Sequence, residues 1–122
     1  MKFDSSRPIY LQIIDNYKKQ LIRGEIKSGE KILSQREFAE RQNVNPNTVQ
    51  RAYREMEMME LVKTIRGQGT FVSVEEDALK SMKVEMAKEL LAHFINEMRS
   101  LGFADEEIWK VVKKNSVKDQ GG

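Results

Sequence analysis

The chain has 122 residues, of which 39% are hydrophobic and 33% charged, a balance typical of one small domain with or without an appendage. No apolar run reaches the length of a membrane span and the first residues do not resemble a signal peptide, so we expect a cytoplasmic protein without a membrane partner. With no cysteine and a single histidine, His93, the sequence excludes a disulfide framework and the usual catalytic triads and metal clusters, and we expect neither a metal, nor a cofactor, nor enzyme activity.

The net charge of +2 is unevenly divided along the chain. Residues 1–74 carry 13 Lys and Arg against 9 Asp and Glu, a net charge of +4, whereas residues 75–122 carry 8 against 10, a net charge of −2. The basic excess of the first part suits contact with a polyanion such as DNA.

Residues 7–24 are predicted to form the first helix. Pro8 suits the first turn of a helix, and apolar side chains then recur at a spacing of four, at Ile9, Ile13, Tyr17 and Leu21. Gly24 can adopt the left-handed conformation that ends a helix. Residues 25–33 are expected to be a connector.

A short second helix is predicted from Ser34 to about Gln42. The four residues that begin at Ser34 match a capping box, in which the Ser34 hydroxyl and the Glu37 carboxylate each accept a backbone N–H of the first turn. Phe38 would be buried. Asn43 suits the turn that follows, because asparagine tolerates a positive φ better than most residues.

The stretch from Asn45 to Glu60 has the features of a recognition helix. Asn45 is a favourable N-cap and Pro46 a favourable first residue. One face carries apolar side chains and the opposite face polar and basic ones: Val49, Ala52, Tyr53 and Met56 on the first, Asn47, Gln50, Arg51 and Arg54 on the second. The polar groups can bind base edges or phosphates, and two short helices joined by a tight turn indicate a helix-turn-helix. Taken alone, the stretch also fits an ordinary amphipathic surface helix.

A β-hairpin is predicted behind the recognition helix. β-Branched residues alternate over residues 61–74, and Arg66, Gly67, Gln68 and Gly69 separate the two strands. A hairpin in this position is a wing, and we expect Arg66, Gly67 and Gln68 at its tip to contact DNA. The alternative is a plain exposed turn.

The last part of the chain is predicted to be a pair of helices. The first spans about residues 75–101 and Gly102 breaks it; Asp105 can cap the second. Their apolar side chains are too many for two helices to bury on themselves. We therefore expect a dimer interface formed by Leu90, Leu91, Phe94, Ile95, Met98, Leu101, Ile108, Trp109 and Val112. The alternative is that the helices fold back on their own winged helix.

These residues carry a resemblance to a known family. Residues 29–72 read GEKILSQREFAERQNVNPNTVQRAYREMEMMELVKTIRGQGTFV, which closely resembles the DNA-binding domain of the GntR family of bacterial transcription regulators. The opening RPIYLQIIDNYKKQLIRGEIKSGEKI, the phrase NVNPNTVQRAY and the short C-terminal part resemble its YtrA subfamily. The resemblance implies a winged helix-turn-helix followed by a two-helix dimerisation element. It also implies operator binding as a dimer, usually as a repressor and often of transporter genes.

The resemblance also assigns positions. It implies DNA contacts at the start of the second helix and of the recognition helix, at Ser34, Gln35, Arg36, Asn45, Pro46, Asn47, Thr48 and Gln50, and a minor-groove contact of the wing tip at Arg66 and Gly67. Three positions depart from the family pattern. Leu33 stands where a proline is usual, and Asn43 and Glu60 stand where glycines are common.

We therefore predict a mostly α fold with a small β-hairpin wing, divided into a DNA-binding domain over residues 1–74 and a helical dimerisation element over residues 75–122. The predicted function is a sequence-specific transcription regulator, a homodimer on a near-palindromic double-stranded operator. A winged helix used only for protein–protein contact is the alternative. Arg36, Asn47, Gln50, Arg51, Arg54 and Arg66 on one surface favour DNA over that alternative. The sequence does not identify an effector.

Overall fold

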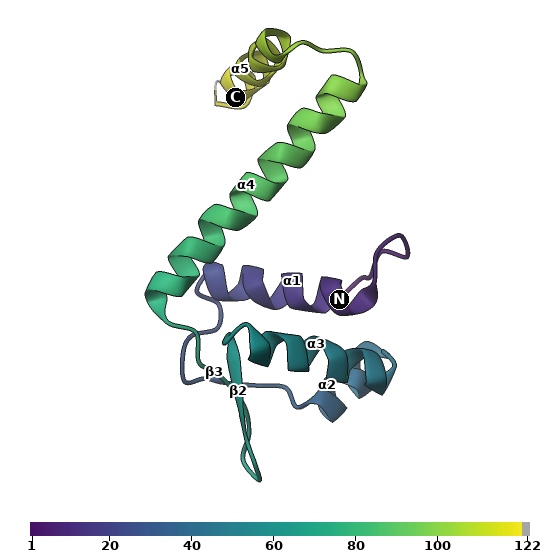
Figure 1. The fold of residues 1–122 in the computed structure, drawn as a ribbon, viewed down its shortest axis with the longest axis vertical. Coiled ribbons are helices and arrows are strands. Elements are labelled where there is room, and N and C mark those ends of the chain that lie inside the picture. Colours follow the sequence, from purple (N-terminus) through teal and green to yellow (C-terminus); the bar gives the residue numbers. More distant parts are fainter. Residues whose placement is uncertain (121–122) are drawn as a thin grey trace. The chain divides into compact units, whose positions relative to one another are not determined.

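The structure is a computed structural model that describes the backbone of residues 1–120 and the side chains of residues 1–116 (Figure 1). The elements follow in the order α1 (Ile9–Ile22), β1 (Lys31–Ile32), α2 (Gln35–Gln42), α3 (Pro46–Met58), β2 (Val62–Ile65), β3 (Gly69–Val72), α4 (Glu76–Ser100) and α5 (Asp105–Gln120). They confirm the predicted fold class, mostly helical with a small antiparallel sheet. The chain divides into two compact units, Met1–Met82 and the residues from Lys83 onward. Among residues 1–120, none of the helices has both the length and the apolar composition needed to span a bilayer.

The core of the first unit lies between α1, α2, α3 and the sheet. The apolar stripes predicted for the three helices are buried there, and Tyr53 and Ile13 are completely covered. Tyr17, Phe38 and Tyr53 form an aromatic cluster with ring centroids 6.0 to 6.2 Å apart. The Tyr53 hydroxyl donates to the Leu33 carbonyl at 2.6 Å and lies 2.9 Å from the Tyr17 hydroxyl. Burial raises the pKa of Tyr53 well above its usual value and also raises the pKa of Tyr17, so both phenols stay neutral.

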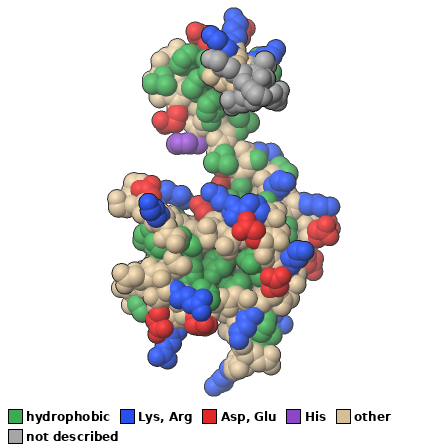
Figure 2. All heavy atoms as spheres, turned by 180° about the vertical axis from the view of Figure 1, so that it is seen from behind, with side chains coloured by type: hydrophobic (Ala, Val, Ile, Leu, Met, Phe, Trp, Pro, Cys, Tyr) green, Lys and Arg blue, Asp and Glu red, His purple; other side chains and the backbone are tan. Residues whose placement is uncertain are grey.

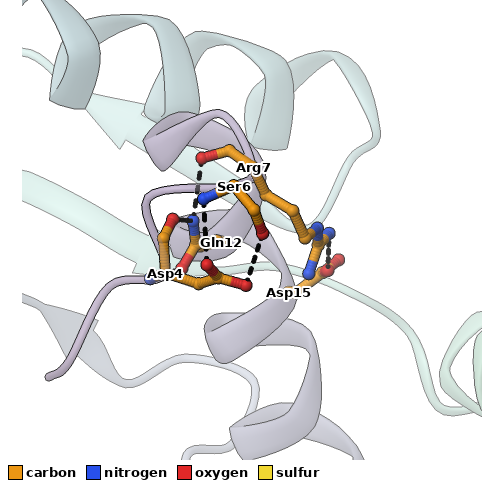
Figure 3. Close-up of polar contacts among 5 residues, drawn as sticks. All are labelled: Asp4, Ser6, Arg7, Gln12 and Asp15. Atoms are coloured by element: carbon orange, nitrogen blue, oxygen red, sulfur yellow. Dashed lines mark hydrogen bonds and ion pairs between the residues drawn. The ribbon is translucent and has the colours of Figure 1, made fainter.

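The first eight residues fold back on the start of α1 (Figure 3). The Gln12 amide binds both backbone groups of Asp4, accepting from its N–H at 2.7 Å and donating to its carbonyl at 2.6 Å. The Ser6 hydroxyl donates to the Asp4 carboxylate at 2.7 Å, and Arg7 pairs with Asp15 at 2.9 Å. These bonds hold the N-terminal end of α1 in a defined position.

The sheet has three strands, in the order β1–β3–β2, and both pairings are antiparallel. β2 and β3 form the predicted hairpin, with Val62 opposite Val72 and Ile65 opposite Gly69. The prediction that residues 25–33 are only a connector was wrong, because β1 pairs with β3 through Lys31 and Ile32. Two residues are too few for an alternating pattern, so the strand has no signal in the sequence.

Four helices end with a residue in the left-handed conformation. It is Gly24 after α1 (φ 75°), Asn43 after α2 (φ 52°), Glu60 after α3 (φ 61°) and Gly102 after α4 (φ 92°). After α3, the N–H of Glu60 donates to the Glu57 carbonyl at 2.9 Å and the N–H of Leu61 to the Met56 carbonyl at 3.0 Å. This pattern, a Schellman motif, requires a positive φ at its central residue. It accounts for the glycine usual at the position of Glu60.

α4 and α5 are joined as predicted at Gly102, but Asp105 does not cap α5. The N–H of Ala104 donates to Glu107 Oε1 at 3.0 Å, which satisfies one backbone donor at the start of the helix. The Asp105 carboxylate instead accepts two bonds from Arg99, at 2.9 and 3.0 Å, and this ion pair lowers the pKa of Asp105. The first turns of α4 belong to the first unit, since Leu79 and Met82 pack on its core. The predicted domain limit at Val74 thus precedes the limit between the compact units.

Candidate nucleic-acid interface

α3 presents a polar face to solvent, as the sequence predicted. The opposite face of α3 is fully buried, since Val49, Ala52, Tyr53 and Met56 are each 0% exposed. Asn47, Gln50, Arg51 and Arg54 are exposed and Thr48 is half-buried. The apolar stripe therefore fixes the rotation of the helix about its axis, and that rotation turns these amide and guanidinium groups outward.

The first turns of α2 and α3 border one groove of about 430 Å³. It is lined by Gln35, Arg36, Ala39, Glu40, Pro46, Asn47 and Gln50. The structure therefore brings together five of the predicted DNA-contacting residues from two helices. Glu40, which the sequence did not single out, also lines the groove and lies 3.3 Å from Arg36 Nε.

Two predicted contact residues have structural roles at helix ends. The Ser34 hydroxyl accepts the N–H of Glu37 at 3.0 Å while Glu37 Oε1 accepts the N–H of Ser34 at 3.2 Å, so the capping box is confirmed. The backbone N–H of Ser34 lowers the pKa of Glu37, because it stabilises the ionised carboxylate. Asn45 caps α3 by accepting the N–H of Asn47 at 2.8 Å, with Pro46 as the first helical residue. In the part of the chain that the structure describes, the N–H groups of Gln35 and Arg36 at the start of α2 have no hydrogen-bond partner, whereas at the start of α3 Asn45 binds those of Asn47 and Thr48.

Arg51 and Arg54 differ in their surroundings. Arg51 contacts α1, where its guanidinium carbon lies 3.8 Å from the centre of the Tyr10 ring. The Arg51 Nε atom also lies 3.6 Å from Glu55 Oε1. Arg54 is exposed and has no ion pair among the described residues. Tyr10 was missed by the sequence analysis, since nothing in local spacing links it to a residue 41 positions away.

The wing extends from the first unit as a narrow hairpin (Figure 1). Arg66, Gly67 and Gln68 form its exposed tip. Gly67 has a φ of 79°, a conformation that glycine adopts without strain, and the N–H of Gln68 closes the turn on the Ile65 carbonyl at 2.9 Å. Gly69 has a φ of 131°, which side chains rarely adopt, and a Cβ there would lie 2.6 Å from Lys31 Cε, so the end of the Lys31 side chain would have to move.

The predicted dimer residues lie on the C-terminal helices, where Figure 2 shows hydrophobic side chains gathered at the surface. Leu90, Leu101 and Trp109 are 69, 73 and 61% exposed, whereas Ile108 is 6% exposed and already covered within its own unit. A groove of about 350 Å³ between α4 and α5 is lined by Leu91, Phe94, Ile95, Arg99, Asp105, Ile108, Trp109 and Val112. Met98 is half-buried.

Comparison with known proteins identifies the family. Residues 9–72 match the family model described as bacterial regulatory proteins, gntR family. The chain is 43% identical to the uncharacterized HTH-type transcriptional regulator YhcF of Bacillus subtilis over 112 residues. This alignment covers 92% of this chain and 93% of that protein. The chain is 38% identical over 119 residues to the HTH-type transcriptional repressor YtrA of the same organism, covering 97 and 92%. The solved structure of a GntR family transcriptional regulator from Listeria monocytogenes superimposes with a TM-score of 0.81 at 40% identity, covering 92% of this chain and 98% of that one.

The resemblance drawn from the sequence is thus confirmed, both for the family and for the likeness to YtrA. These matches span the winged helix and the C-terminal helices alike. The chain therefore belongs to the GntR family of bacterial regulatory proteins, whose members are DNA-binding transcription regulators rather than enzymes.

Proposed function

We propose that the chain is a homodimeric repressor that binds a near-palindromic DNA operator. The observation that carries this proposal is the groove between α2 and α3, around which the amides of Gln35, Asn47 and Gln50 and the guanidinium of Arg36 converge. Amides can bind the edge of adenine in two places, and arginine can bind guanine or phosphate. A winged helix used only to contact protein would not require this concentration of groups on the outward face of α3.

In the proposed complex the first turns of α3 enter the major groove. Asn47 and Gln50 contact base edges, and Arg36 and the free N–H groups at the start of α2 contact one phosphate backbone. The wing tip, with Arg66 and Gln68 exposed, enters the adjacent minor groove. Phosphate contacts fix the register of the protein on the duplex, whereas the two amides discriminate between bases.

Dimerisation would occur through the C-terminal helices. Leu90, Leu101 and Trp109 are more than half exposed, and a soluble domain seldom leaves so many large apolar side chains in one region uncovered. A second copy covers them with an identical surface, as a two-fold dimer requires. The paired α3 helices would then bind half-sites about 34 Å apart, one turn of the duplex.

The names of the relatives support the proposed role as a repressor. YtrA is a repressor by name, and we extend this role to the chain, with transporter genes as the target class that the resemblance implies. A repressor acts when its operator overlaps a promoter, so a reporter gene with the selected site at its promoter should be silenced when the protein is expressed.

Selection of duplexes from a random-sequence pool by the full chain tests the proposal. The expected product is one enriched sequence with two inverted half-sites, bound far more tightly than poly(dI-dC). Recovery of duplexes without any common sequence would overturn the proposal and favour the protein-contact alternative. An enriched site that does not silence the reporter would retain specific DNA binding and refute the repressor role.

A further inference from the structure

The position of Arg51 distinguishes it from the other polar residues of α3. Its Nη2 donates to the Tyr10 hydroxyl at 3.1 Å, its guanidinium carbon lies 3.8 Å from the centre of the Tyr10 ring, and its Nε lies 3.6 Å from Glu55 Oε1. Contacts from α1 and from the next turn of α3 therefore hold the guanidinium plane in one orientation. The side chain is still 53% exposed. Since a guanidinium has five N–H donors, several remain available on its solvent side.

Arg51 also lies on a different edge of α3 from the groove. Asn47 and Gln50 border α2, whereas Arg51 borders α1. An α-helix with its side chains is about 10–12 Å across, and the major groove is about 12 Å wide. A helix that fills the groove therefore directs its middle at the bases and its two edges at the two phosphate backbones. Arg36 at the α2 edge and Arg51 at the α1 edge would face opposite backbones.

We propose that Arg51 binds a DNA phosphate rather than a base, and that Tyr10 is the positioning residue that orders it for this contact. The inference rests on the proposed function. The Tyr10 ring stacks on one face of the guanidinium and the Tyr10 hydroxyl binds one of its N–H groups, so the side chain loses little freedom when it meets the phosphate. Glu55 has the opposite effect, because its carboxylate competes with the phosphate for the same cation. Tyr10 thus makes the N-terminal end of α1 part of the DNA-binding surface.

Arg51→Gln and Tyr10→Leu, alone and combined, test this inference in the full chain. The probes are a duplex selected from a random pool by the wild-type protein and poly(dI-dC), titrated by fluorescence anisotropy at several KCl concentrations. For each subunit in contact, Arg51→Gln should weaken binding to both by about tenfold, the effect of one charge-assisted hydrogen bond, and should reduce the slope of log affinity against log salt by about one. Tyr10→Leu should weaken binding severalfold when Arg51 is present and not at all in the Arg51→Gln background. Glu55→Gln should strengthen binding.

Several results would overturn the inference. A loss confined to one base pair of the selected duplex would make Arg51 a base contact, and unchanged affinity would exclude a DNA contact. An equal effect of Tyr10→Leu in both backgrounds would show that Tyr10 does not act through Arg51. If Tyr10→Leu melts below the assay temperature, Tyr10→Phe decides the matter: it keeps the ring, and it should weaken binding slightly only when Arg51 is present. A wild-type protein that selects no sequence would refute the proposed function itself, whereas normal selection with an inert Arg51→Gln refutes this inference alone.

Discussion

Replacing Glu60 with glycine should stabilise the winged helix. Glu60 has a φ of 61°, imposed by the hydrogen bonds that end α3. A residue with a Cβ loses about 1–2 kcal/mol in this conformation, and the greater freedom of glycine in the unfolded chain offsets about 0.5–1 kcal/mol of the gain. The net increase in the free energy of unfolding is about 0.5–1 kcal/mol, which raises the melting temperature of a unit of this size by about 2–8 °C.

Thermal unfolding followed by circular dichroism, at one protein concentration, measures the effect. Glu60→Ala is the matched control, because it removes the same carboxylate and keeps the Cβ that causes the strain. Its stability should stay within about 0.5 kcal/mol of the wild type. If Glu60→Ala stabilised the protein as much as Glu60→Gly, the gain would come from the lost charge and the reasoning from backbone strain would be refuted. Asn43→Gly should gain less than Glu60→Gly, because asparagine tolerates this region of φ.

Three further predictions concern the interface and its caps. Gln50→Ala should cost about 1–3 kcal/mol of binding at one base pair and relax specificity there; an equal loss on all duplexes would make Gln50 a backbone contact. Arg66→Ala should weaken binding and lower the salt slope by about one for each subunit, whereas an unchanged slope and affinity would place the wing tip in solvent. The lowered pKa of Glu37 means that its ionised form stabilises the fold, so this contribution is present at neutral pH and is lost as the pH falls below about 4.3, the ordinary pKa of glutamate. Glu37→Gln keeps a capping group that does not titrate, so this variant should lose less stability in acid than the wild type. Identical acid unfolding curves for the two proteins would show that protonation of the Glu37 cap does not cause the loss.

Local patterns predicted the parts of the fold that depend on neighbours in the chain. The capping box at Ser34, the N-cap at Asn45 and the break at Gly102 each need only a few adjacent residues, and each was found where expected. The family pattern marked Glu60 only as a position where glycine is common, and the structure supplies the physical reason, a φ of 61°.

Contacts between distant segments could not be predicted in this way. β1 has only two residues and exists because β3 supplies its partners. Arg51 and Tyr10 meet because α1 packs against α3 in the folded unit. Aspartate is a common N-cap residue, but the Asp105 carboxylate instead binds Arg99, which lies on the other side of the turn. In each case the deciding partner is set by tertiary packing rather than by spacing along the chain.

The central claim is that two copies, joined by their C-terminal helices, bind one operator together. Leu90→Glu tests it directly, because Leu90 is 69% exposed in the single chain and its replacement should not disturb the fold. At a dimer interface, the new carboxylate would be buried without a partner, at a cost of about 3 kcal/mol or more, and would weaken association by at least about a hundredfold. Asn96→Glu is the matched control: it adds the same charge to an exposed position of α4 away from the apolar stripe.

Sedimentation velocity and operator titration at one salt concentration should be carried out on all three proteins. The wild type and Asn96→Glu should sediment as dimers and bind one selected duplex per dimer. Leu90→Glu should be a folded monomer that binds the same duplex weakly, because each copy then holds a half-site alone. A Leu90→Glu protein that remains dimeric and binds with wild-type affinity would contradict the account.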